Sequence, residues 1–111
     1  MKIITKKKFI EETYNVDYEL IKWLNEHLKG YLKYAKKHIK LDYYTFEHEG
    51  KTLTQEEMIN RVIEITDCLL NSQIYWNYEE NDNSSLDCEK MYRMKDEMYD
   101  ILKAIHWHLW W

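Results

Sequence analysis

The sequence predicts an all-α protein, or an α protein with a minor β-hairpin. We expect an antiparallel three-helix bundle with the small hairpin between helices one and two. Three segments repeat apolar residues at spacings of three and four, as one face of a helix does. Proline is absent and glycine occurs only twice, so long helices can run without a break. The 111 residues are 45% hydrophobic and 32% charged, which suits one domain, residues 1–111, with one core.

The first long helix is predicted over residues 17–40, with a shorter helical piece before it over residues 6–13. Its apolar face consists of Leu20, Leu24, Leu28, Tyr31, Leu32, Ala35 and Ile39. Asn15 or Asp17 is the candidate N-cap, since either side chain can accept a hydrogen bond from a free backbone N–H. Gly30 costs about 1 kcal/mol relative to alanine inside a helix. It either permits a close helix crossing or is merely tolerated.

The link that follows, residues 42–53, is rich in residues that favour strands and contains Gly50 near its middle. This pattern predicts a β-hairpin in which Gly50 supplies a positive φ. A lone two-stranded hairpin is marginally stable in water. We therefore expect it to lean on the bundle through Tyr44, Phe46 and Leu53.

The second long helix is predicted over residues 54–78 and the third from Ser84 or Ser85. Thr54-Gln-Glu-Glu57 is a capping box, in which the two side chains satisfy backbone N–H groups reciprocally. The short polar link over residues 80–84 favours antiparallel neighbours. The apolar stripe of the third helix consists of Met91, Met94, Met98, Ile101, Leu102, Ile105 and Leu109.

The residue patterns predict no catalytic residues, no metal site and no cofactor. Helical di-iron sites need Glu-x-x-His on two helices, and this pattern does not occur. Glu47-His48-Glu49 offers two carboxylates on one face of a strand, which is too few ligands for a site. Cys68 lies beside an apolar stripe and is interpreted as a small buried residue rather than a nucleophile. Cys68 and Cys88 lack metal-ligand spacing, so both are expected to be free thiols.

Charge is distributed unevenly along the chain. Residues 1–40 hold ten lysines and five acidic residues, whereas residues 41–111 hold six Lys or Arg and fifteen acidic residues. Five lysines of the first helix are interleaved with tyrosines and form a candidate nucleic-acid surface: Lys29, Lys33, Lys36, Lys37 and Lys40. Arginine is scarce and the net charge is −4, so a solvated helix face is the preferred interpretation.

Aromatic side chains give the strongest indication of function. The chain holds ten Tyr and five Trp, the residues that dominate protein-binding hot spots. One cluster combines Tyr75, Trp76 and Tyr78 with acidic neighbours Glu79, Glu80 and Asp82, and the other consists of Trp107, Trp110 and Trp111. The second cluster either covers the end of the bundle or forms an interface; an exposed patch would favour a partner or a homodimer.

These observations predict a small non-enzymatic, protein-binding protein. A short chain rich in Lys, Glu, Tyr, Asn and Ile resembles the small proteins of phages and mobile elements, many of which inhibit a host defence nuclease as anti-CRISPR proteins do. Helical bundles of this length also resemble bacteriocin immunity proteins, which neutralise a toxin. Nucleic-acid binding through the lysine-rich helix is a further alternative. No signal peptide or membrane-spanning run is apparent, so a cytoplasmic location without membrane contact is expected.

Overall fold

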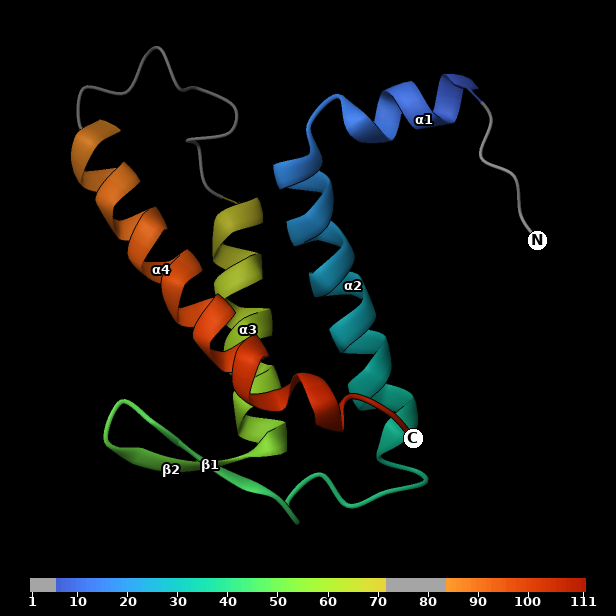
Figure 1. Ribbon diagram of the computed structural model, residues 1–111, viewed down its shortest axis with the longest axis vertical. Helices are drawn as coiled ribbons and strands as arrows, with labels where there is room; N and C mark the ends of the chain where they lie inside the picture. The colour runs from blue at the N-terminus through green and yellow to red at the C-terminus, as the bar shows by residue number, and fades with distance from the viewer. Residues whose placement is uncertain (1–5, 72–83) are drawn as a thin grey trace.

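The computed structural model describes residues 6–71 and 84–111. Its elements in chain order are α1 (Lys6–Thr13), α2 (Val16–Ala35), β1 (Thr45–His48), β2 (Lys51–Thr54), α3 (Gln55–Leu70), α4 (Ser84–Ile105) and the 3₁₀ helix η3 (His106–His108). The chain is mostly helical, and the two strands form a small antiparallel sheet between α2 and α3 (Figure 1). The predicted fold class, including the hairpin and its place in the chain, is therefore confirmed.

Helix α3 occupies the centre of the fold. It packs against both α2 and α4, and the three helices alternate in direction (Figure 1). Helices α2 and α4 contact each other much less than either contacts α3, so the predicted three-helix bundle is not confirmed. The shared core consists of Ile21, Leu28, Met58, Ile59, Val62, Ile65, Leu69, Met98, Ile101 and Ile105.

Helix α1 has the predicted bounds. Helix α2 begins where it was predicted to begin but ends earlier. The side chain of Asn15 caps α2 by accepting a hydrogen bond from the backbone N–H of Tyr18. The helix ends at Ala35 rather than at residue 40, so the predicted end is wrong. The chain turns there because Leu41 is buried under the helices, and its carbonyl accepts the backbone N–H of Glu56 at 3.0 Å. Tertiary contacts thus override local helix propensity.

The hairpin pairs Thr45 with Thr54 at its open end and His48 with Lys51 at its tight end. Between them, Glu49 has φ +50° and Gly50 has φ +76°. Two successive positive φ values are what a two-residue type I′ turn requires. The sequence predicted the glycine but not that a glutamate would share this conformation.

Two of the three hairpin residues expected to contact the helices do so. Phe46 and Leu53 are partly buried against the core, as predicted. Tyr44 is exposed instead and packs against the ring of His108, with ring centroids 4.3 Å apart. The hairpin is therefore anchored by one side chain from each strand.

Helices α3 and α4 begin at the predicted residues. The capping box is present, since Glu57 N–H donates to Thr54 Oγ1 at 3.2 Å and Thr54 N–H donates to Glu57 Oε1 at 2.9 Å. The predicted continuation of the second helix beyond residue 71 lies outside the described residues. Ile65 and Met98 are fully buried and Leu24 is partly buried, as the predicted apolar stripes require. Leu20 is exposed, so its place in the first stripe is wrong; its neighbour Ile21 is buried there instead.

The surroundings of Cys68 and Gly30 change the interpretation of both residues. Cys68 is exposed rather than buried, because it precedes the buried Leu69 by one residue and so points about 100° away on the helix. A Cβ added at Gly30 would meet no atom within 4 Å, so this glycine does not serve a close helix crossing. Among the described residues, no helix is both long enough and apolar enough to cross a lipid bilayer.

Candidate partner-binding surface

Exposed aromatic side chains gather at one end of the molecule. They come from two distant parts of the sequence: the end of α2 with the link after it, and residues 106–111. Figure 1 places the segment after α4 against the end of α2. We call this region the aromatic end surface, and its exposed aromatic members are Tyr34, Tyr43, Tyr44, Trp107, Trp110 and Trp111.

Buried polar groups hold the main chain of this surface in place. Gln55 is only 2% exposed, and its Nε2 donates to the carbonyl oxygen of His108 at 2.9 Å. The hydroxyl of Tyr31 lies 3.2 Å from the same carbonyl oxygen and 3.1 Å from that of Trp110. It carries one proton, so it donates to one of them at a time. Burial raises the pKa of Tyr31, which keeps the hydroxyl protonated as a donor.

The tryptophan side chains remain largely uncovered although their backbone is held. Trp107 is 81% exposed, Trp110 68% and Trp111 55%. Trp111 stacks on the ring of His38, with centroids 4.4 Å apart and planes 7° from parallel. The end of the fold is thus partly covered by Trp111, while most of each indole faces outward.

Two hollows lie on this surface. The first, of about 310 Å³, is lined by Ile39, Lys40, Tyr43, Tyr44, Gln55, His108 and Trp110. The second, of about 390 Å³, is lined by Glu26, His27, Gly30, Tyr31, Tyr34 and Trp111. Trp110 and Trp111 therefore line different hollows, and the absent side chain of Gly30 leaves room in the second.

The five candidate nucleic-acid lysines divide into two groups. Lys29 forms an ion pair with Asp67 at 2.9 Å, and Lys36 pairs with Glu56, so both tie α2 or its end to α3. The other three lie at the aromatic end surface: Lys33 and Lys37 hold their ammonium groups 5.4 and 5.7 Å from the ring centre of Tyr34, and Lys40 lines the first hollow.

The structure does not place every predicted site residue. The aromatic and acidic cluster of Tyr75, Trp76, Tyr78, Glu79, Glu80 and Asp82 lies outside the described residues. Conversely, sequence reasoning missed Gln55 and His108. Neither has a signal in the sequence, because their contact joins the Gln55 side chain to the main-chain carbonyl of a residue 53 positions away.

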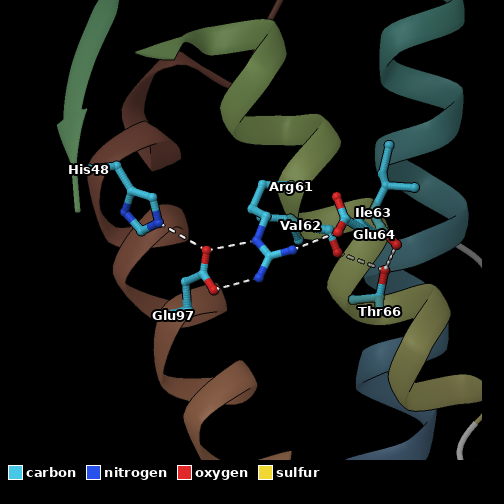
Figure 2. A network of polar contacts seen from close by, with 7 residues as sticks. All are labelled: His48, Arg61, Val62, Ile63, Glu64, Thr66 and Glu97. Atoms are coloured by element: carbon cyan, nitrogen blue, oxygen red, sulfur yellow. Dashed lines mark hydrogen bonds and ion pairs between the residues drawn. The ribbon is translucent and has the colours of Figure 1, made fainter. Parts of the chain in front are cut away.

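A second polar cluster joins the hairpin, α3 and α4 (Figure 2). Arg61 donates through Nε to Glu97 Oε2 at 2.7 Å and through Nη2 to Glu97 Oε1 at 2.8 Å. Its Nη1 donates to Glu64 at 2.7 Å. Because Arg61 donates to it, the pKa of Glu97 falls to about 2, although burial opposes the shift. The ionised carboxylate also accepts from His48 Nε2 at 3.0 Å.

The same cluster contains a group of potential metal ligands. One ligand atom each from His48, Glu49 and Glu97 lies within 4.8 Å of the others. The sequence could not indicate this group, because Glu97 is far from the hairpin along the chain. Arg61, however, engages both oxygens of Glu97 and places a positive charge beside any cation bound there. We therefore interpret the cluster as a clamp on the hairpin.

Comparisons with protein-family models, with curated proteins and with solved structures find no match to this chain.

Proposed function

We propose that this chain is a non-enzymatic binding protein that recognises a protein partner through the aromatic end surface. One observation carries the proposal: three tryptophans keep more than half of their surface exposed on a main chain held by a buried glutamine and a tyrosine. Single exposed apolar residues are common, but exposed apolar side chains that gather in one patch with a polar rim mark interaction sites.

The way the backbone is held favours tight recognition. Trp and Tyr supply large contact areas with few rotatable bonds, and they dominate binding hot spots. Hydrogen bonds to the carbonyls of His108 and Trp110 order this backbone before a partner arrives. Less conformational entropy is then lost on binding, which increases affinity.

Within this class, we propose an inhibitor of a host defence nuclease encoded by a phage or mobile element. Such an inhibitor would act in the host cytoplasm. In this proposal the acidic residues Glu79, Glu80 and Asp82 replace phosphates in a basic channel of the partner. A toxin-neutralising immunity protein is the alternative in the same class. Co-expression with a candidate toxin distinguishes the two, since only an immunity protein restores growth.

Nucleic-acid binding is a second candidate function, and one observation favours it. Lys33, Lys37 and Lys40 lie beside exposed aromatic rings, the combination that binds single strands by charge and stacking. A gel-shift titration at two salt concentrations tests it. Phosphate contacts strengthen at low salt, so the absence of a shift there excludes this function.

The main test compares two matched tryptophans. Trp111 and Trp23 are each 55% exposed, and each stacks on a histidine ring, but only Trp111 lies in the aromatic end surface. A partner is first captured from host lysate with the wild-type chain and identified. We expect Trp111→Ala to weaken binding of that purified partner at least about tenfold and Trp23→Ala to leave it unchanged. Equal effects of the two substitutions would contradict the proposal.

A further inference from the structure

We infer that the first hollow of the aromatic end surface binds an acidic peptide segment of the partner, with one bulky apolar side chain inserted and a flanking carboxylate paired with Lys40. This inference rests on the proposed function and names the chemistry of its partner. Three features of the hollow carry it: its lining, a buried hydrogen-bond acceptor and the charge around it.

The lining suits a single bulky side chain. Rings from Tyr43, Tyr44 and Trp110 and the aliphatic side chain of Ile39 surround a space of about 310 Å³. This is at the lower end of the range of roughly 300–1,000 Å³ typical of ligand sites. Such a hollow accepts an apolar anchor from a peptide rather than a whole domain.

Gln55 adds a directional requirement. It lines the hollow and is only 2% exposed. Its Nε2 donates hydrogen bonds to the carbonyl oxygen of His108 and to the hydroxyl oxygen of Tyr31. Its Oε1 accepts no hydrogen bond from residues 6–71 or 84–111. A buried acceptor without a donor is destabilising, so a ligand N–H that reaches Oε1 from the hollow would gain affinity there. A peptide backbone supplies such a donor.

Charge decides the character of the flanking residues. None of the described residues that line the first hollow is acidic, and Lys40 lines it. The ammonium group of Lys37 lies instead over the ring of Tyr34, which lines the second hollow. Glu26 lines the second hollow, and Asp42 does not line the first, so the lining of the first hollow carries one ammonium group and no carboxylate. A carboxylate that flanks the apolar anchor would pair with the ammonium group of Lys40 and speed association.

A nucleic-acid strand fits these features less well than a peptide. Three lysines without an arginine provide few contacts for a phosphate backbone, whose binding strength depends on the number neutralised. The first hollow is also small and ringed by aromatic side chains, whereas single strands bind along open grooves. The experiment therefore includes a nucleic-acid probe beside the peptides.

The experiment selects ligands without knowledge of the partner. The full chain is immobilised and a displayed library of random peptides is panned against it. We expect the selected peptides to carry a net negative charge around one Leu, Ile, Phe or Trp. Selection of neutral or basic peptides, or of none, would overturn the inference.

Fluorescence anisotropy with the most enriched peptide then locates its site. We expect Lys40→Glu to weaken binding about tenfold or more, which corresponds to 1.4 kcal/mol or more, and Trp110→Ala to do the same. Lys90→Glu is the matched control, because Lys90 is an exposed lysine near the start of α4 at the other end of the fold.

The variants separate failure of the inference from failure of the proposed function. If Trp110→Ala abolishes binding of the captured partner while the lysine variant does not, the surface is correct and the acidic ligand is wrong. If neither variant affects it, both are wrong. Tight binding of a labelled oligothymidylate in place of the peptide would overturn the inference in favour of nucleic acid. Self-association removed by Trp110→Ala, measured by sedimentation, would assign the hollow to a second copy.

Discussion

Two polar clusters hold parts of this fold together, one around Arg61 and one around Gln55. They differ in charge and in whether the side chains beside them remain exposed. Around Arg61 the groups are charged, and the guanidinium donates to Glu97 through two nitrogens and to Glu64 through a third. Around Gln55 the groups are neutral, they bond mainly to backbone carbonyls, and one acceptor has no described donor. The first cluster fastens elements together. The second fastens a backbone whose side chains remain free to bind, so only the second fits a recognition site.

The largest expected effect is on the charged cluster. Arg61→Ala should lower the free energy of unfolding by about 2–3 kcal/mol, because Glu97, whose side chain is 13% exposed, would lose its counter-ion. Arg93→Ala is the matched control, since Arg93 is an exposed arginine with a single weak pair at 3.9 Å, and it should cost less than about 0.5 kcal/mol. Urea denaturation measures both. Similar losses would mean that the two arginines are equivalent.

A pH titration sharpens the assignment to Glu97. Its folded pKa of about 2 lies below its ordinary value of 4.5, so its contribution to stability is present above pH 4.5. That contribution should be lost as the pH falls from about 4.5 to about 2. The stability difference between wild type and Glu97→Gln should therefore shrink over this interval. A constant difference would show that the carboxylate's charge is not what stabilises the fold.

The neutral cluster should respond more weakly and more locally. Gln55→Leu removes the amide that holds His108, at an expected cost of about 1–2 kcal/mol. Hydrogen exchange at the backbone amides of Leu109 and Trp110 should accelerate more than exchange in the middle of α3. Tyr31→Phe, which removes the other donor and keeps the ring, should produce a smaller change in the same amides. Uniform acceleration throughout the chain would instead indicate a general loss of packing.

The smallest expected effect on stability concerns the indoles themselves. Trp107→Ala should change the free energy of unfolding by less than about 0.5 kcal/mol, because this side chain is 81% exposed. Thermal unfolding followed by circular dichroism measures it. A loss above about 1 kcal/mol would mean that the tryptophan contributes to the core, and the contrast between the two clusters would fail.

The elements that could be predicted from sequence are those specified by local patterns. The capping box at Thr54, the N-cap at Asn15 and the turn at Gly50 each depend on residues within a few positions of one another, and the apolar stripes depend on helical periodicity. The end of α2 could not be predicted in this way, since it follows from burial of Leu41 beneath distant helices.

Only part of the candidate site could be predicted, because only some of its features can be inferred without contacts between distant residues. Exposed tryptophans can be anticipated from composition, because so small a core cannot enclose fifteen Tyr and Trp side chains. Their proximity to Lys37 and Lys40, and their support by Gln55, depend on contacts between residues more than fifty positions apart. A single sequence contains no pattern that reports such contacts.

The joining of residues 31–44 with residues 106–111 has a consequence for when this protein can act. Neither segment alone presents the paired hollows, because the indoles of one segment complete walls begun by the other. Under the proposed function, a nascent or proteolytically clipped chain would therefore offer no recognition epitope, even if its individual helices had formed. Any partner that reads this epitope would respond only to fully assembled molecules, which makes the contact a built-in check on folding.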